Sequence, residues 1–432
     1  NSMEAKSISK DEIIPAVTKI NSSHNVRSSS NRLFMALLAI FVVSVVRMAV
    51  HEFTHVQEQL RELHSPHHLD MKRFTQMTPD HDFQAKNSNE ENVKKENESG
   101  NSETEIVEDA PTIAGADNER QSEVQPYIEI LQRAGVDLSA DPELVKRLPL
   151  RTEVADLYGS EPVIIGLDTC KAFRETIDPG NAYVGPAGMF NTGTNLMSSY
   201  LGNNCRLPAR QKKHSMGQTG MRWQVPWGKH TPVSWRGRHV AMAGGKGVVQ
   251  TDVLPVVTIK DPYTWMGSMC RKSYSANWRH EKEHCPNLVA NDIDRKKWPN
   301  IPDVIPVNVR YSSENATHHE SLLGLWNDWY EEWFRVSFPR LIVRFEDLLF
   351  HPEEVLTQVC QCAGGEITEP FSYTVESAKQ GGAHQGSSGM ISAMVRYGNP
   401  EKRISNITED DLMFVKKTVD MDVMKAFNYK IA

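Results

Sequence analysis

The stretch AYVGPAGMFNTGTNLMSSYL, residues 182–201, holds an apolar run, a glycine-rich loop and an amphipathic segment in direct succession. The apolar run predicts a short strand, and the spacing of apolar residues after the loop predicts a helix. Two glycines in the loop have the G-x-x-x-x-G spacing of phosphate-binding loops, and the second permits a tight turn before the helix N-terminus. This pattern predicts a phosphate site made by Asn191, Thr192, Gly193, Thr194 and Asn195.

The loop lacks the lysine that follows the second glycine in nucleoside triphosphatases. Thr194 and Asn195 occupy the places of the usual Lys-Ser/Thr pair. This substitution disfavours ATP or GTP hydrolysis, which uses that lysine and a Mg²⁺-binding hydroxyl. It is compatible with a 5′-phosphosulfate, which carries less charge than a triphosphate. Taken alone, the stretch also fits a glycine-rich turn before an ordinary helix.

A second segment, VVTIKDPYTWMGSMCRKSY at residues 256–274, has the chemistry of a phosphate monoester site. A β-branched strand ends at Lys260, a turn follows at Asp261-Pro262, and a helix begins near Thr264. The strand end and the second helical turn can converge, which would bring Lys260 and Ser268 to one anion. The alternative is a solvated lysine and a serine on a helix surface.

Together these segments resemble the sulfotransferases that use 3′-phosphoadenosine 5′-phosphosulfate, in particular the Golgi type II membrane carbohydrate sulfotransferases. Aligned on Gly193, the residues FNTGTN replace the family's loop Pro-Lys-Ser-Gly-Thr-Thr, so Asn191 stands where the family has Lys or Arg. Lys260 and Ser268 match the family's 3′-phosphate motif Arg-x-Pro-x-x-x-x-x-Ser, with lysine for arginine. A lysine lacks the bidentate fork of arginine.

A third segment, RLIVRFEDLLFHPEE at residues 340–354, resembles the family's Arg-Tyr-Glu-Asp-Leu…Pro stretch. We interpret it as structural and expect Arg344 to pair with Glu346. The resemblance also suggests that the late residues Arg396-Tyr397-Gly398 and Lys402-Arg403 close over the nucleotide. It covers roughly residues 160–432.

The resemblance implies an α/β, P-loop-like sulfotransferase fold with a central, mostly parallel sheet flanked by helices. Alternating strand-like and helical runs favour the same class. We expect strands at 163–166, 182–185, 254–259, 305–309 and 341–344, and helices at 194–201, 265–274 and 318–336. The apolar stripe of the last helix is typical of core packing.

The implied reaction moves a sulfuryl group from 3′-phosphoadenosine 5′-phosphosulfate, as co-substrate and without a metal, to a hydroxyl or amine. The stretch WQVPWGKHTP, residues 223–232, is similar to the Lys-Thr-His-x-Pro of cytosolic members. We therefore predict His230 as general base and Lys229 as the cation at the departing phosphate. Glu175 is a second candidate base, because Golgi members often use a carboxylate. The alternative is a surface loop with incidental charges. Arg236 and Arg238 could line the site of an anionic acceptor, or they could lie in a solvated loop.

The acceptor is not readable, although a glycan or glycoprotein hydroxyl is the first expectation and a protein tyrosine the second. Two other functions stay open: a non-catalytic glycan-binding protein on the same fold, and a P-loop kinase or nucleotidase. The formal net charge of −7 argues against nucleic acid as a partner. The sequence does not predict an oligomeric state.

Residues 33–50, LFMALLAIFVVSVVRMAV, have the composition and nearly the length of a transmembrane helix. Basic residues gather before this segment, which predicts a cytosolic N-terminus and a lumenal C-terminal part. A cleaved secretory signal is the alternative. We therefore expect a single-pass type II Golgi membrane protein with a cytosolic tail (1–32), a signal anchor (33–50), a flexible acidic stem (51–124), a helical lead-in (125–160) and a catalytic domain (161–432).

The six cysteines suit disulfides in an oxidising lumen, and six buried thiols are the alternative. Cys270 lies close to Cys285 in sequence, and Cys170 and Cys205 flank the loop, so these two pairs are reasonable disulfide partners. A third bond between Cys360 and Cys362 is less obvious. Sequence alone does not set the connectivity. The triplets Asn97-Glu98-Ser99, Asn315-Ala316-Thr317 and Asn406-Ile407-Thr408 are candidate N-glycosylation sites on the lumenal side.

Overall fold

The computed structural model describes residues 113–140, 142–238, 247–376, 389–405 and 407–432, which all belong to one compact unit. The predicted tail (1–32), signal anchor (33–50) and most of the stem (51–124) lie outside these ranges. Among the residues described, no helix has the length and apolar character that a bilayer crossing requires.

A four-stranded mixed sheet forms the centre, in the order β1-β8-β4-β2. Its strands are β1 (Ile164–Ile165), β2 (Tyr183–Gly188), β4 (Val253–Ile259) and β8 (Leu341–Arg344). β2, β4 and β8 are parallel, and β1 joins β8 as an antiparallel edge. The prediction of an α/β domain is confirmed. Because β2 and β4 are parallel neighbours, their carboxyl ends meet at one edge of the sheet.

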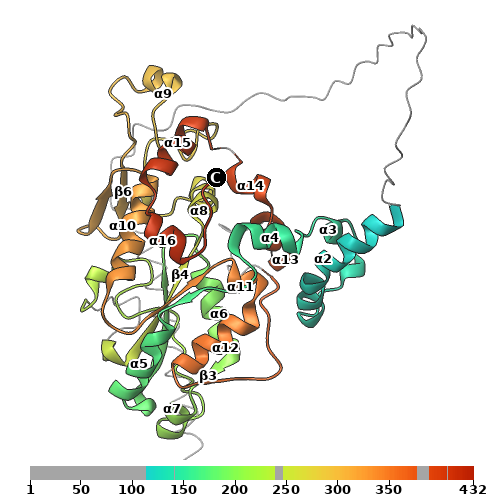
Figure 1. The fold of residues 1–432 in the computed structure, drawn as a ribbon. Coiled ribbons are helices and arrows are strands. Elements are labelled where there is room, and N and C mark those ends of the chain that lie inside the picture. Colours follow the sequence, from blue (N-terminus) through green and yellow to red (C-terminus); the bar gives the residue numbers. More distant parts are fainter. Residues whose placement is uncertain (1–112, 141, 239–246, 377–388, 406) are drawn as a thin grey trace, which may run out of the picture. The chain divides into compact units, whose positions relative to one another are not determined.

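Alternate residues of these strands enter two separate hydrophobic cores, one on each face of the sheet. In β4, Leu254 and Val256 pack into one core, whereas Val257 and Ile259 pack into the other. The first core takes side chains from α5 (Cys170–Thr176), α6 (Thr194–Asn204) and α12 (Pro352–Cys362). The second, larger core includes α8 (Pro262–Arg271) and α10 (Leu322–Arg335) (Figure 1).

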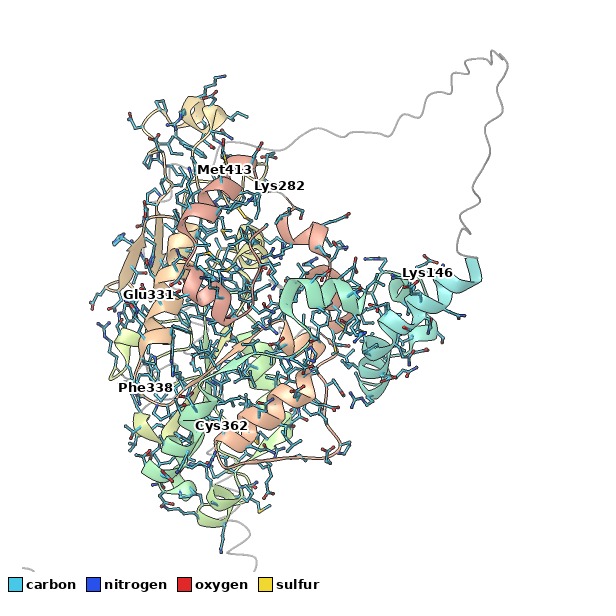
Figure 2. All side chains as sticks on the ribbon, in the orientation of Figure 1. Lys146, Lys282, Glu331, Phe338, Cys362 and Met413 are labelled. Atoms are coloured by element: carbon cyan, nitrogen blue, oxygen red, sulfur yellow. A yellow bond between two sulfur atoms is a disulfide. The ribbon has the colours of Figure 1, made fainter. Side chains whose placement is uncertain are left out.

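The second core also includes most of the remaining helices. They are α2 (Ile113–Arg133), α4 (Arg151–Tyr158), α11 (Asp347–Phe350), α13 (Met390–Tyr397), α15 (Glu409–Thr418) and α16 (Met421–Ala426). Further short helices are α3 (Pro142–Lys146), α7 (Pro208–Lys213), α9 (Asp292–Lys297) and α14 (Pro400–Ile404). Figure 2 shows side chains filling the space between these helices and the sheet.

Two small antiparallel sheets lie outside the central one. β3 (Cys205–Arg206) pairs with β9 (Glu366–Ile367), and β6 (Val307–Arg310) lies between β5 (Ala276–Asn277) and β7 (Ala316–His319). The strand expected at 305–309 therefore belongs to a separate antiparallel sheet. The helix expected at 318–336 begins only at Leu322, because the residues before it pair with β6 and Ser321 caps its first turn.

Helix α2 begins at Ile113, within the segment predicted to be flexible stem. Val124 is buried in the larger core, and Arg120 donates a hydrogen bond to the Leu148 carbonyl at 3.0 Å. These contacts order the end of an otherwise acidic, aromatic-free stretch. The boundary expected at residue 124 is thus too late by about three turns of helix.

All six cysteines form disulfides, and only one expected pair is correct. The Cys270–Cys285 bond is confirmed, whereas the expected Cys170–Cys205 pair is wrong. Cys170 bonds to Cys362 and Cys205 bonds to Cys360, so α12 is tied to both α5 and β3 (Cys362 is labelled in Figure 2). Three disulfides are typical of a secreted or lumenal domain.

Candidate functional site

The glycine-rich loop joins β2 to α6 at the carboxyl edge of the sheet. Gly188 and Gly193 have φ of 153° and 83°, a region that favours glycine. A Cβ on Gly188 would lie 2.4 Å from Thr258 Oγ1, and one on Gly193 would lie 2.3 Å from Phe345 Cδ2. At both positions, the backbone conformation favours glycine and the surrounding atoms leave no room for a side chain.

Thr192 supports the loop from the inside. It is fully buried, donates a hydrogen bond to the Met189 carbonyl at 2.8 Å and contacts Thr258 Oγ1 at 3.0 Å. Trp265 of α8 donates from Nε1 to the Phe190 carbonyl at 2.8 Å. These bonds fix the loop against β4 and α8. The Thr192 hydroxyl therefore forms hydrogen bonds within the protein interior and does not point to the outer face of the loop.

The N-terminus of α6 presents backbone amides at this loop. Gly193 is the N-cap residue and has no side chain with which to cap them, whereas Asp261 caps α8 through Tyr263 N and Thr264 N. The dipole of α6 favours an anion at the same point. Thr194, the first residue of α6, is buried beside these amides.

Asn191 links the loop to the end of α8. Its Nδ2 donates to the carbonyls of Lys272 at 2.7 Å and Ser268 at 3.3 Å. Its φ of 64° is a left-handed conformation that asparagine tolerates well. The position at which the resembled family carries a cation is thus occupied by an amide that donates to one carbonyl in α8 and to one just after it.

The segment carrying Lys229 and His230 runs along the outer edge of β2. Val225 N donates to the Pro186 carbonyl at 3.1 Å, and Gly188 N donates to the Lys229 carbonyl at 2.8 Å. This pairing brings both residues to the carboxyl end of β2. Lys229 Nζ then donates to Asn195 Oδ1 at 2.6 Å, in the first turn of α6, and lies 4.2 Å from the centroid of the Trp223 ring system.

His230 lies against the same loop. Its Nδ1 is 2.7 Å from the Gly188 carbonyl oxygen, and its ring centroid is 4.7 Å from that of Phe190. A carbonyl oxygen only accepts hydrogen bonds, so Nδ1 carries the proton and the neutral ring has its lone pair on Nε2. Sequence reasoning placed Lys229 and His230 as neighbours of the loop, and the structure brings them there.

Lys260 and Ser268 form the second candidate anion site. Lys260 is 1% exposed, and its Nζ donates to Ser268 Oγ at 3.0 Å. Arg271 NH2 donates to the same hydroxyl oxygen at 3.0 Å. Burial lowers the pKa of Lys260. Two cations therefore converge on one hydroxyl, and Arg271 is a member of this site that the sequence motif did not single out.

The ring of Phe345 lies between the two candidate anion sites. It is the side chain that a Cβ on Gly193 would meet, and its centroid is 4.6 Å from Lys260 Nζ. Tyr397 closes the group, with its ring centroid 5.1 Å from that of Phe345 and 3.7 Å from Lys260 Nζ. The loop and the Lys260 site therefore lie against one aromatic side chain.

The start of α8 is held by a buried ion pair. Arg403 donates to Asp261 Oδ2 from Nε at 2.9 Å and from NH2 at 2.7 Å, and both residues are buried. Glu346 accepts from Asp261 N at 3.2 Å. Arg403, which we expected to close over a nucleotide, is buried and pairs with the residue that caps α8. This arrangement places Lys260 at a rigid junction of strand and helix.

The expected pairing of Arg344 with Glu346 is wrong. Arg344 instead forms a bidentate pair with Asp347, at 2.7 and 2.6 Å. Residues 344 and 346 in an extended run would share a face, but β8 ends at Arg344 and α11 begins at Asp347. Burial and nearby Asp261 raise the pKa of Glu346 to about 7.

The aromatic stripe of α10 does more than fill the core. Trp326 Nε1 donates to the Lys260 carbonyl at 3.0 Å, and Trp329 Nε1 donates to the His230 carbonyl at 3.3 Å. Tyr330 donates to the Thr258 carbonyl at 2.9 Å. One helix therefore holds both candidate regions. Periodicity predicted the stripe but gave no sign of these bonds.

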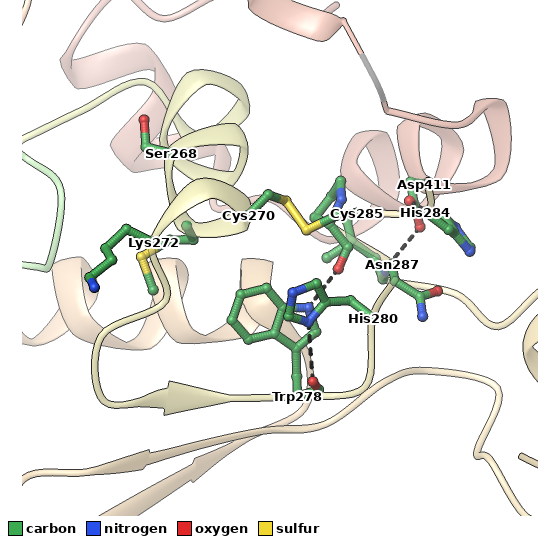
Figure 3. The surroundings of a disulfide bond; sticks show 12 residues. Ser268, Cys270, Lys272, Trp278, His280, His284, Cys285, Asn287 and Asp411 are labelled. Carbon is green, nitrogen blue, oxygen red and sulfur yellow. Dashed lines mark hydrogen bonds and ion pairs between the residues drawn. A yellow bond between two sulfur atoms is a disulfide. The ribbon is translucent and has the colours of Figure 1, made fainter. Parts of the chain in front are cut away.

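The end of α8 is clamped by the Cys270–Cys285 disulfide. Figure 3 shows this bond running from α8 to the segment that carries His284. Trp278 donates to the Pro286 carbonyl at 2.9 Å, and Asp411 of α15 accepts from Leu288 N and Val289 N. The disulfide joins the residue next to Arg271, so it restrains the second candidate anion site.

The other residues predicted to act at the site make their contacts away from the loop and from Lys260. Glu175 is exposed near the end of α5, where it pairs with Lys171 at 3.8 Å. It lies before the amino end of β2 in the sequence, whereas the loop follows the carboxyl end of that strand. Arg236 lies 3.6 Å from the Phe338 ring centroid, and Arg238 donates to Asn315 Oδ1 at 3.1 Å.

Within the described ranges, no cluster of His, Cys, Asp and Glu side chains has the makings of a metal site. A comparison with protein-family models finds no match, and a comparison with curated proteins finds none either.

Proposed function

We propose that this protein is a sulfotransferase, with the sulfotransferase fold, that uses 3′-phosphoadenosine 5′-phosphosulfate and transfers its sulfuryl group to a hydroxyl or amine. The observation that carries the proposal is the position of Phe345 between Gly193 and Lys260. A nucleotide with phosphates on its 5′ and 3′ positions needs two anion sites on neighbouring elements. The loop after β2 and the helix after β4 would supply such a pair.

The donor would be held at both ends by residues of this chain. The α6 amides, together with Lys229 near Asn195, would bind the 5′-phosphosulfate. Lys260, Ser268 and Arg271 would bind the 3′-phosphate. Lys229 would supply the positive charge that Asn191 does not.

His230 would act as general base. Its Nδ1–H is bonded to the Gly188 carbonyl, which leaves the lone pair of the neutral ring on Nε2. As the acceptor oxygen bonds to sulfur, the bond from sulfur to the bridging phosphate oxygen breaks and Nε2 takes the acceptor proton. Lys229 and the α6 amides would stabilise the negative charge on the departing nucleotide.

The acceptor we propose first is a glycan hydroxyl, in a type II protein anchored in the Golgi membrane. The three disulfides favour an oxidising compartment. The anchor rests on residues 33–50 of the sequence. A phenolic hydroxyl of a protein tyrosine is the second acceptor to test.

The test measures donor binding and transfer with the full-length protein in detergent. Calorimetry should detect 3′,5′-bisphosphoadenosine, and radiolabelled donor should transfer sulfate to at least one member of a glycan panel. Lys260→Met should weaken nucleotide binding by about 10- to 100-fold, because a charge-assisted bond to phosphate is lost. The matched control is Lys272→Met, an exposed lysine just after α8, which should bind normally.

Failure of the wild-type protein to bind the bisphosphonucleotide would overturn the proposal. Glycan binding without any sulfate transfer would favour a non-catalytic binding protein. Magnesium-dependent hydrolysis of ATP would favour a kinase or nucleotidase.

A further inference from the structure

We propose that the acceptor is a glycan chain held on both sides of the unit that receives sulfate, with one neighbouring sugar stacked on Trp223 and another on Tyr274. The sulfated unit is then internal to the chain. This inference rests on the proposed function, because it takes His230 to be the general base. It assigns the acceptor contacts to two aromatic residues that have no part in either phosphate motif.

Two aromatic side chains are exposed within the ranges that the structure describes, and both lie near the candidate site. Trp223 is 55% exposed and Tyr274 is 37% exposed. Every other Trp, Tyr and Phe in those ranges is buried or partly buried. A single exposed apolar residue is common on protein surfaces, but exposed rings that gather around one site indicate contact with a ligand.

A row of contacts connects the two exposed rings through the proposed base. Lys229 Nζ lies 4.2 Å from the Trp223 ring centroid, and His230 is the next residue along the chain. The His230 ring centroid is 4.7 Å from that of Phe190. Phe190 in turn stacks on Tyr274 at 5.5 Å, with an interplanar angle of 14°. In this order of contacts, His230 comes between Trp223 and Tyr274.

The backbone of Trp223 is fixed to two elements of the site. Ser198 of α6 donates from Oγ to the Trp223 carbonyl at 3.0 Å. Arg222 N donates to the Val184 carbonyl at 2.9 Å, which pairs the same segment with β2. The exposed ring therefore lies on an anchored backbone, so binding a sugar there requires little further ordering of the protein.

Tyr274 is held close to the end of α8 by the phosphate loop and a disulfide. Asn191 Nδ2 donates to the Lys272 carbonyl at 2.7 Å, and the Cys270–Cys285 bond anchors the last turn of the helix (Figure 3). Tyr274 has a φ of 53°, a left-handed conformation that bulky residues rarely adopt and that glycine adopts easily. Residues kept in this conformation gather at functional sites.

The surroundings of the two rings suit a sugar. One face of a pyranose ring presents C–H groups, whose partial positive charge is attracted to the negative face of an aromatic ring. The sugar hydroxyl groups lie at the edge, where polar side chains can bind them. Lys229 lies beside Trp223, and Lys272 Nζ lies 5.9 Å from the Tyr274 ring centroid. A tyrosine acceptor would instead need one enclosed apolar slot beside the base.

Two rings with the base between them set a minimum length for the acceptor. A disaccharide contacts at most one ring while its reacting unit lies at the base, whereas a hexasaccharide can contact both. Each stacking contact contributes a factor of about 3 to 10 in affinity. We therefore expect KM to be about 3- to 10-fold lower for a hexasaccharide than for a disaccharide of the same repeat. Sulfate should appear on internal units of the hexasaccharide.

The experiment measures transfer from radiolabelled 3′-phosphoadenosine 5′-phosphosulfate by the full-length protein in detergent. The acceptors are hyaluronan, chitin and β-1,4-galactan oligosaccharides of two and six units, together with a tyrosine-containing peptide. Mass spectrometry locates the sulfated unit in each product. The dependence on length is measured with the wild-type protein, so it does not require any variant to fold.

Trp223→Ala and Tyr274→Ala should each raise KM for the hexasaccharide about 3- to 10-fold, because each change removes one stacking contact. The disaccharide should respond to at most one of these changes. Tyr274→Phe keeps the ring and should retain the wild-type KM. Met413→Ala is the matched control, because Met413 is an exposed apolar residue of α15 (Figure 2) and its loss should leave KM unchanged.

Equal KM values for the two lengths, sulfate confined to chain ends, or an unchanged KM in both alanine variants would overturn this inference while leaving a sulfotransferase function standing. Transfer to the tyrosine peptide and to none of the sugars would overturn it as well. Absence of nucleotide binding and of all transfer would instead overturn the proposed function.

Discussion

Replacing Gly193 by alanine tests whether the two candidate anion sites are coupled through Phe345. The new Cβ would lie 2.3 Å from Phe345 Cδ2 and 2.9 Å from Cε2. Phe345 is buried, and its ring also contacts Lys260 and Tyr397. The methyl group of alanine at position 193 should therefore displace the Phe345 ring, which also borders the candidate site at Lys260.

The expected cost has two parts. A non-glycine residue at φ of 83° costs about 1–2 kcal/mol. Forcing a buried ring to shift costs about 1–3 kcal/mol. We therefore expect a loss of about 2–4 kcal/mol in the free energy of unfolding. Nucleotide affinity should fall by at least about tenfold, since 1.4 kcal/mol of distortion suffices for that.

The assay is urea unfolding followed by calorimetric titration with 3′,5′-bisphosphoadenosine. Gly202→Ala is the matched control, because Gly202 lies within α6 and a new Cβ there would meet no atom within 4 Å apart from the helix's own backbone. That change should stabilise the protein by about 0.5–1 kcal/mol and leave binding unchanged. Wild-type affinity in a folded Gly193→Ala variant would refute the reasoning. Gly193→Asp should abolish binding altogether, because its carboxylate would repel the ligand phosphate.

Three further changes test the residues around the site. Arg403→Met should destabilise the protein by about 3–5 kcal/mol in urea unfolding, because the charge of Asp261 is left buried and unpaired; a loss below about 1 kcal/mol would contradict the assigned pair. His230→Gln should lower kcat by about 10²- to 10⁴-fold with nucleotide affinity nearly unchanged, and full activity would exclude His230 as the base. Changing both Cys270 and Cys285 to serine should cost about 3 kcal/mol, the value for a loop of this length; unchanged stability under matched conditions would show that the clamp does not stabilise the fold.

Sequence predicted the strand–loop–helix at Gly193 and the strand–helix at Lys260 because their signals are local. Gly193 needs only its own backbone conformation to mark the turn, and Asp261-Pro262 marks the start of a helix by cap and ring chemistry. The helix expected at 265–274 instead spans Pro262–Arg271, because Asp261, which we expected in a turn, caps its first turn. The alternation of strands and helices was sufficient for the α/β class.

Other features depended on which distant residues meet. Disulfides join α12 to both α5 and β3. Cys362 and Cys360 therefore bond to Cys170 and Cys205, which flank the loop and were expected to bond to each other. The strand expected at 305–309 is real, yet no local property says which sheet it joins. Arg344 pairs with Asp347 rather than Glu346 because β8 ends at Arg344 and α11 begins at Asp347, so the three residues do not form one extended run.

The sequence by itself determined the strand–loop–helix at Gly193 and the strand–helix at Lys260, since each depends on backbone preferences within about ten residues. Only the tertiary structure decided that Phe345 lies between them, that Tyr397 stacks on Lys260, and that α10 binds both regions. The physical reason is that burial, hydrogen bonding and charge pairing act between neighbours in space. Those neighbours are set by how the helices and strands pack together, which local periodicity does not encode.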